Sequence, residues 1–326
     1  MPTQARPRGR NLSMLMGDQA VDFDTAAASG SYYPVPVYSE SIADQEPFEE
    51  DPLLGATGLD NNRDSQEPAP GLRRGSGSVT TPLCLNNIGL WLAGLFGAPD
   101  TTGSEAPYTH VFTSGGEALP YRTIEVMKRA GKFHQHIGCL VAAGRFRVAG
   151  GEGGFRRAEF DLVHKQTNRL TSSGAGSPQT ALALARVPAS RGIVRVDSTI
   201  TGVCLSLDAT YDNRPTPREF VGQDGLIAGF DLDEFAVSSL TPRVRYVDDT
   251  FAEMQGDGLT HTVEIEYPGS VSGHKLVLAW SAVRFERGGI PIEGPGGIEV
   301  QMNGRAEQTG AAPMLTATLI NAIEEY

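Results

Sequence analysis

Two histidines are the first residues whose spacing could support chemistry. His134 and His136 lie two positions apart in a strand-like segment, so both imidazoles would point to one face, as a pair of metal ligands does. A metal site needs at least a third ligand, and no Cys, Asp or Glu cluster stands near them in the sequence. Exposed or hydrogen-bonded histidines are therefore the favoured interpretation, and we expect no metal and no cofactor.

The glycines and carboxylates give no stronger indication of an active site. The segment Gly150-Gly-Glu-Gly-Gly lacks the Gly-Lys-Ser/Thr ending of a phosphate-binding loop and is typical of a hairpin turn. Three carboxylate pairs occur, at Asp231/Asp233, Asp248/Asp249 and Glu264/Glu266. Acid–base catalysis needs a pocket that separates two pKa values, and nothing in the sequence indicates one. We therefore predict that the protein is not an enzyme.

Composition and charge exclude several classes of protein. The 326 residues carry a net charge of −12, whereas a protein that grips phosphate backbones needs an excess of Lys and Arg. The three cysteines, Cys84, Cys139 and Cys204, are too few and too scattered for a disulfide framework, and we expect buried thiols. The longest apolar run, 88–96, is too short to cross a membrane. The N-terminus resembles no signal peptide, so we expect assembly in a cytoplasm and no membrane partner.

The elements that would position these side chains are mostly strands with two short helices. Alternating patterns predict strands, and the main ones are 32–38, 122–129, 133–148, 155–164, 202–211, 243–247, 261–267, 275–286, 298–304 and 314–320. Helical spacing predicts one helix over 87–96, with Ile88, Trp91, Leu92 and Leu95 on its packing face. The same reasoning predicts a second helix over 231–240, which would pack through Leu232 and Phe235.

The order of elements occurs twice along the chain. For example, Tyr108-Thr-His-Val and Leu259-Thr-His-Thr-Val each follow a predicted helix and precede long strands. A Ser-, Gly- and Ala-rich segment separates the two halves and is typical of a linker. We therefore predict an N-terminal arm, a first module with a long loop, a linker and a second module, over residues 1–30, 31–170 (loop 56–78), 171–191 and 192–326.

Several strands alternate so that one face is apolar and the other is acidic or polar. Residues on the polar faces include Glu159 and Asp161, Glu264 and Glu266, and Glu299. The simpler interpretation is the solvated exterior of a β-sandwich. The alternative is that these carboxylates line a water-filled channel, as the interior of a large β-barrel allows.

Six segments, in this order, resemble the tail tube proteins of long-tailed bacteriophages of the siphovirus type. They are Tyr33-Pro-Val-Pro-Val-Tyr-Ser-Glu-Ser, Asp51-Pro-Leu-Leu-Gly, Gly89-Leu-Trp-Leu-Ala-Gly-Leu-Phe-Gly, Tyr108-Thr-His-Val-Phe-Thr-Ser-Gly, Leu119-Pro-Tyr-Arg-Thr-Ile-Glu and Gly294-Pro-Gly-Gly-Ile-Glu-Val. The likeness runs from about residue 30 to the C-terminus, and the order and spacing of the segments carry it.

The resemblance implies a mainly β fold of two tandem β-sandwich or barrel modules, each with a short packed helix, which join into a continuous β-barrel around a ring. It implies a structural subunit of the virion tail, assembled in the host cytoplasm, whose stacked rings let viral DNA pass through an acidic lumen into the host. Three chains per ring would give pseudo-sixfold geometry, and six chains are the alternative. The implied partners are further copies of the chain and the tape measure, tail terminator and distal tail proteins, with DNA as cargo.

Two other functions remain open from the sequence. A tail terminator, baseplate or capsid-decoration protein would share the β-rich fold but would not polymerise into long tubes. A carbohydrate-binding or hydrolytic β-sandwich would need exposed aromatic side chains on a concave face, yet the chain has only two Trp residues, and we place Trp91 on an apolar helix face.

Overall fold

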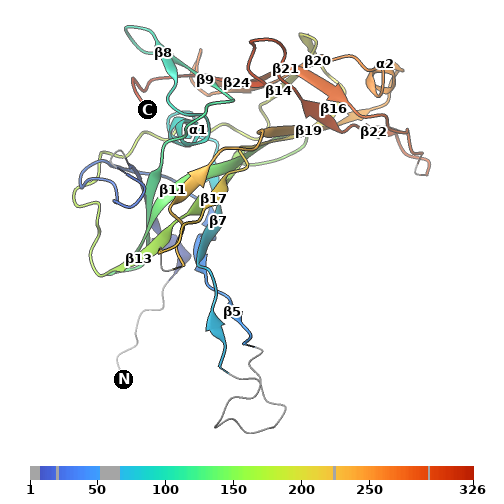
Figure 1. Ribbon diagram of the computed structural model, residues 1–326. Helices are drawn as coiled ribbons and strands as arrows, with labels where there is room; N and C mark the ends of the chain where they lie inside the picture. The colour runs from blue at the N-terminus through green and yellow to red at the C-terminus, as the bar shows by residue number, and fades with distance from the viewer. Residues whose placement is uncertain (1–7, 20–21, 52–66, 223–224, 293) are drawn as a thin grey trace.

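The computed structural model describes residues 8–19, 22–51, 67–222, 225–292 and 294–326 (Figure 1). These residues form a mainly β protein, as expected, in which most strands belong to one hydrogen-bonded network. Neither of the two α-helices found in the described ranges is long and apolar enough to cross a membrane.

Strands account for most of the regular structure, and the helices are short. The helices are η1 (Gly9–Asn11), α1 (Ile88–Phe96) and α2 (Thr250–Met254). The strands are β1 (Ser13–Asp18), β2 (Tyr32–Pro34), β3 (Ser39–Glu40), β4 (Ala43–Gln45), β5 (Phe48–Glu49), β6 (Ala69–Pro70), β7 (Arg74–Pro82), β8 (Asp100–Thr102), β9 (Tyr108–Thr113), β10 (Arg122–Arg129), β11 (Lys132–Ala149), β12 (Arg157–His164), β13 (Gln166–Leu170), β14 (Ile193–Val196), β15 (Thr199–Ile200), β16 (Cys204–Asp212), β17 (Thr216–Arg218), β18 (Gly229–Asp231), β19 (Val237–Arg245), β20 (His261–Pro268), β21 (Lys275–Phe285), β22 (Glu299–Gln301), β23 (Gly304–Ala306) and β24 (Leu315–Asn321).

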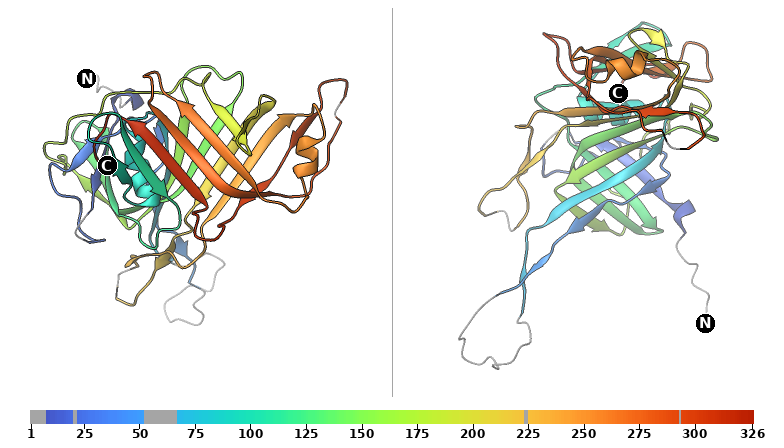
Figure 2. Two further views of the ribbon diagram at one scale, coloured as in Figure 1. Left: turned by 90° about the horizontal axis from the view of Figure 1, so that it is seen from above. Right: turned by 90° about the vertical axis from the view of Figure 1, so that its right-hand side faces the viewer.

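Most of the long strands form two antiparallel layers, and the first half of β11 also pairs with β10 and β13. The first layer has the order β7–β12–β11–β16–β19, and β19 continues to the short strands β22 and β23. The second has the order β14–β20–β21–β24–β9. Pairing between β21 and β23 joins the layers. In the right-hand view of Figure 2, β7 (cyan) and the green strands β11 and β12 lie side by side.

A single large apolar core lies between the layers. Helix α1 contributes Trp91, which is fully buried and stacks on Phe160 of β12 with 4.9 Å between the ring centroids. Trp280 of the second layer donates from its indole Nε1 to Ser238 Oγ of β19 at 2.8 Å. Because the two side chains come from different layers, this bond helps to hold one layer to the other.

The residues of α1 are apolar on every side, and the structure accounts for this because all nine are buried. Ile88, Trp91, Leu92 and Leu95 are at most 1% exposed, as expected for the predicted packing face. Gly89 allows the closest contact, because a Cβ there would lie 2.3 Å from the ring of Tyr326. The helix therefore needs glycine at this position for steric reasons.

The second predicted helix is wrong. Residues 231–240 contain the end of β18, a loop and the start of β19, which pairs with β16 from Val237 to Val244. Phe235, placed on the packing face, is 94% exposed, and Leu232 is half-buried. The second helix is instead α2, which begins beyond the predicted segment. Ladder hydrogen bonds with β16 decide the conformation against the local helical spacing.

Two segments predicted as irregular are partly strands. The described part of the N-terminal arm includes β1, which pairs with β10 and buries Met14 and Met16. The loop predicted over 56–78 contains β6 and the first residues of β7. These first residues of β7 form a ladder with β4. Residues 1–7, 20–21 and 56–66 of these two predictions lie outside the described residues.

The segment predicted as a linker, residues 171–191, is described throughout and contains no helix or strand, only isolated bridges to Cys84 and Phe155. The halves on either side of it pair directly. β11 pairs with β16 over seven residue pairs, and β24 pairs with β9 over six. The first layer is therefore continuous from one half of the chain to the other.

Candidate functional site

The outer face of the first layer carries three of the five carboxylates predicted for a channel, Glu159, Asp161 and Glu299. Strand alternation places one set of side chains in the core and the next outside, as in the burial pattern of β12. The charged side chains on this outer face come from six neighbouring strands, and they are Arg145, Arg147, Arg157, Glu159, Asp161, Asp208, Asp212, Arg243, Arg245, Glu299 and Arg305.

The central arginine of this face bridges two carboxylates. Arg145 lies opposite Glu159 in the ladder between β11 and β12. Its Nη1 is 3.2 Å from Glu159 Oε1, and its Nη2 is 2.6 Å from Asp161 Oδ2. Partial burial raises the pKa of Asp161, and the charge of Arg145 opposes this rise. The single guanidinium thus offsets part of the negative charge of the two carboxylates where the strands meet.

The same arrangement continues across the face. Arg147 Nε lies 3.3 Å from Asp208 Oδ1 on β16, and Arg243 of β19 forms an ion pair with Glu299 of β22. Between these pairs, the hydroxyls of Thr210 and Ser239 are 2.6 Å apart. Ion pairs therefore cross the strands at several points of this face, whereas Arg157, Arg245 and Arg305 form no ion pair with the described residues.

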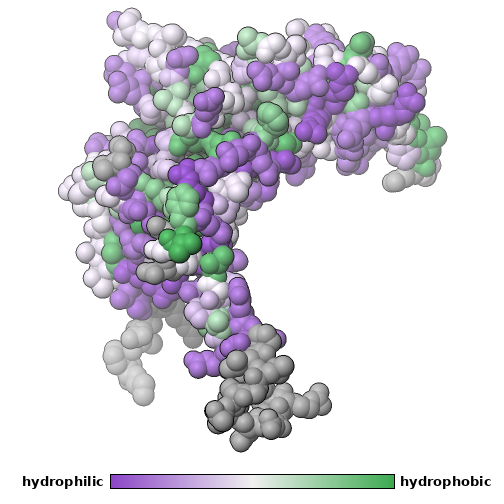
Figure 3. All heavy atoms as spheres, in the orientation of Figure 1, coloured by the Kyte–Doolittle hydropathy of each residue, from purple (hydrophilic) through white to green (hydrophobic). Residues whose placement is uncertain are grey.

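The face that carries the predicted carboxylates is not purely acidic. Glu159, Asp161 and Glu299 do lie on one face, but arginines are interleaved with them. The excess negative charge of the chain is therefore carried by other surfaces. Figure 3 shows hydrophilic residues along the concave margin between the β7 and β22 regions. This face is hydrophilic and carries charges of both signs. Among the described residues, no nucleophile lies beside a general base on it.

The other two predicted carboxylates lie elsewhere. Glu264 and Glu266 are on β20, in the second layer, whose alternate residues Val263 and Ile265 enter the shared core. Both carboxylates form ion pairs with Arg195 of β14, where Arg195 Nη1 lies 2.9 Å from Glu266 Oε2. Because the two layers share one core, their outer faces point away from each other, and the five carboxylates do not form one surface.

The arginines on the first face were not among the predicted site residues. Their signal is present in the segment Gly144-Arg-Phe-Arg-Val, where the arginines alternate with buried Phe146 and Val148. Their carboxylate partners lie on other strands, β12 and β16, so the charge balance depends on the register between strands.

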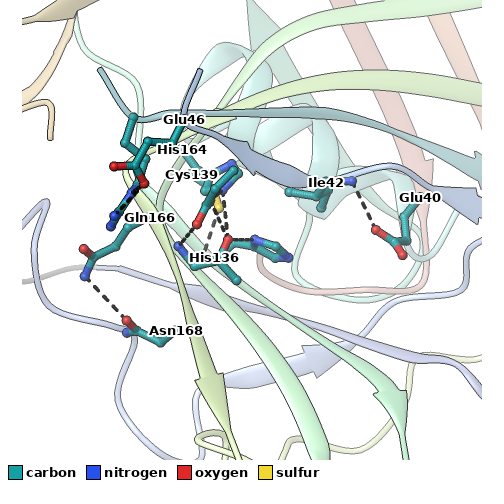
Figure 4. Close-up of polar contacts among 11 residues, drawn as sticks. Glu40, Ile42, Glu46, His136, Cys139, His164, Gln166 and Asn168 are labelled. Carbon is teal, nitrogen blue, oxygen red and sulfur yellow. Dashed lines mark hydrogen bonds and ion pairs between the residues drawn. The ribbon is translucent and has the colours of Figure 1, made fainter. Parts of the chain in front are cut away.

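A second cluster lies inside the protein, beside the base of the β4–β7 hairpin. His164 Nε2 is 2.7 Å from Asp44 Oδ1 and 3.2 Å from Thr167 Oγ1, and His136 Nδ1 is 2.8 Å from Thr167 Oγ1. Figure 4 shows the surroundings of His136 and His164, with Cys139 donating to the His136 carbonyl. His134, the other member of the predicted pair, lies outside this cluster.

The environment holds His136 and Asp44 in definite protonation states. Burial lowers the pKa of His136 to about 3, so the ring is neutral at pH 7. Partial burial of Asp44 would raise its pKa, but hydrogen bonds from His164 and Thr167 lower it to about 2. A neutral imidazole and an ionised carboxylate therefore meet at this point.

Comparison with known families decides the identity. The family model described as phage tail tube protein matches residues 9–306, which is most of the chain. The chain belongs to the phage tail tube protein family. No curated protein matches it. As a tail tube protein it is a structural component of the virion, and self-assembly and contacts with other tail proteins follow from membership of the family.

Proposed function

We propose that this tail tube protein assembles into stacked rings whose channel carries viral DNA into the host, and that the outer face of the first layer lines that channel. The continuous sheet β7–β12–β11–β16–β19, with its charges paired across the strands, carries the proposal. A closed ring of such sheets would remove the strand edges that otherwise promote aggregation.

Charge pairing explains how DNA would slide along this face without binding. Duplex DNA carries one negative charge per about 1.7 Å, and each unpaired Lys or Arg that meets a phosphate adds affinity by releasing counterions. On this face Arg145 is held by Glu159 and Asp161, and Arg147 is held by Asp208. These two arginines are therefore already paired with carboxylates when DNA passes.

We further propose that each chain supplies two tube modules, 31–170 and 192–326, and that three chains form a pseudo-sixfold ring. Two neighbouring modules of a ring would place their inner sheets side by side, and β11 and β16 pair in this way across residues 171–191. In addition, α2 precedes β20 as α1 precedes β9 along the chain. A ring of six chains is the alternative, and symmetry measured on assembled tubes separates the two.

The tape measure, tail terminator and distal tail proteins are the further partners that we propose. Tail tube proteins polymerise, whereas terminator, baseplate and decoration proteins do not form long cylinders. Negative-stain electron microscopy of the purified chain at rising concentration therefore tests the class of tail protein. We expect hollow tubes of uniform diameter, and a chain that stays monomeric even with tail-tip initiators contradicts the proposal.

The charge pairing itself is tested with two matched double variants. Glu159→Gln with Asp161→Asn leaves Arg145 without its carboxylates, and Glu264→Gln with Glu266→Gln removes the same negative charge from the second layer. In particles assembled from each variant, DNA ejection is followed by dye fluorescence at several salt concentrations. We expect the first variant to slow ejection several-fold at low salt, with recovery as salt screens the exposed arginine.

The second variant is expected to eject DNA at the wild-type rate. If both variants behave alike, or if only the second slows ejection, the first-layer face does not line the channel.

A further inference from the structure

The interior cluster beside β4 brings together three potential metal ligands from distant parts of the sequence. Asp44 comes from β4, His136 from β11 and His164 from β12. One ligand atom from each of them lies within 4.8 Å of those of the other two. Thr167, at the start of β13, adds a hydroxyl within 2.8 Å of His136 Nδ1 and 2.7 Å of Asp44 Oδ1.

Both imidazoles are fixed in place by burial. His136 and His164 are 0% exposed. The ring of His164 lies directly over Gly75 of β7, where a Cβ would come within 2.5 Å of it. Asp44 is oriented as well, because the backbone N–H of Thr167 donates to its other oxygen, Oδ2, at 3.1 Å. The cluster is therefore a rigid arrangement of donors with one partly open side at Asp44.

Hydrogen bonding within the protein does not account for the whole cluster. Among the described residues, Nε2 of His136 and Nδ1 of His164 have no hydrogen-bond partner. A buried polar group without a hydrogen-bond partner lowers the stability of the folded chain. The opposite nitrogens, His136 Nδ1 and His164 Nε2, face Asp44 and Thr167, and a metal ion bound at these nitrogens would offset that loss.

We propose that Asp44, His136 and His164 bind a divalent first-row metal ion of the zinc class. Two imidazole nitrogens and one carboxylate oxygen are a common donor set for Zn²⁺ and related ions, at distances of about 2.0–2.2 Å. The Thr167 hydroxyl or a water completes the coordination. Each imidazole binds through its lone pair and keeps its single proton on the other ring nitrogen.

The ion would act as a structural cross-link. Asp44 stands at the base of the hairpin that continues through β5 and β6, and this hairpin projects from the two layers (Figure 1). The histidines belong to β11 and β12 of the first layer. Coordination would therefore tie the projecting hairpin to the body of the subunit and set the angle at which it leaves.

The proposal is tested on the full chain, treated with chelator and then titrated with Zn²⁺ or Co²⁺. We expect one ion per chain, visible Co²⁺ absorption bands of a low-coordinate nitrogen–oxygen site, and a higher melting temperature with Zn²⁺. Asp44→Asn keeps the shape of the side chain but removes its charge, and we expect it to weaken binding about tenfold or more. His134→Gln changes the neighbouring histidine outside the cluster and is expected to bind as the wild type does.

Two results would overturn the proposal. One is wild-type chain that binds neither ion at micromolar concentration. The other is binding that is unchanged in both Asp44→Asn and His136→Gln, which would place the ion at a different site. Circular dichroism of each variant shows that a loss of binding does not come from a loss of fold.

Discussion

At the scale of single residues, the polar face is defined by side chains that neutralise one another across strands. The sequence predicts which residues point outwards, because alternation along a strand needs no tertiary information. It does not predict the partner of Arg145, since Glu159 and Asp161 reach it only through the register of β11 and β12. For this reason the sequence predicts an acidic face where the structure places arginines among the carboxylates.

A histidine in the second half gives a pH-dependent prediction at this scale. His261 Nδ1 lies 2.8 Å from Asp197 Oδ2, and its Nε2 lies 3.1 Å from Asp257 Oδ2. Burial alone would lower the pKa of His261, but the hydrogen bonds and charges of the two carboxylates raise it above 6.5. This stabilisation is complete below the unfolded pKa and is lost as the pH rises through the higher folded pKa.

We therefore expect His261→Gln to lower the free energy of unfolding more at pH 6 than at pH 9. The difference is about 1 kcal/mol or less, because such partly exposed ion pairs are worth about 0.2–1 kcal/mol. Urea denaturation at the two pH values measures it. His274→Gln, at a histidine without an ion pair in the described ranges, serves as the control. A larger loss at pH 9 contradicts the assignment.

At the scale of elements, one helix was predictable and the other was not. The segment 88–96 has apolar residues at helical spacing and a glycine after it, and the structure forms α1 over these residues. The segment 231–240 has similar spacing, but Val237 to Leu240 pair with β16 in the first layer. Hydrogen bonding to a neighbouring strand is not visible in a local pattern, and here it outweighs the pattern.

Paired substitutions test this difference between the segments. Trp91→Ala removes a fully buried side chain that stacks on Phe160, and we expect a loss of about 3–5 kcal/mol in the free energy of unfolding. Phe235→Ala removes a side chain that is 94% exposed, and we expect a change within about 0.5 kcal/mol. Chemical denaturation measures both. Similar losses for the two variants would mean that Phe235 is packed in the folded subunit.

At the scale of the whole molecule, the family and the β-rich class were predictable, whereas the way the layers join was not. The order of short motifs indicated a tail tube protein, and the family match agrees. The continuity of the first layer depends on β11 pairing with β16 across residues 171–191, which no motif encodes. The convergence of Asp44 with His136 and His164 likewise depends on three strands meeting.

If the outer face of the first layer lines the channel, its strands must surround the lumen of an assembled tube. A cryo-electron microscopy map of assembled tubes at side-chain resolution tests it most directly. We expect a hollow cylinder in which β7, β12, β11, β16 and β19 surround the lumen, with Arg145 and Glu159 facing inwards and Glu264 facing away. A lumen surrounded instead by the second layer, with Glu264 and Glu266 of β20 facing inwards, would contradict the claim.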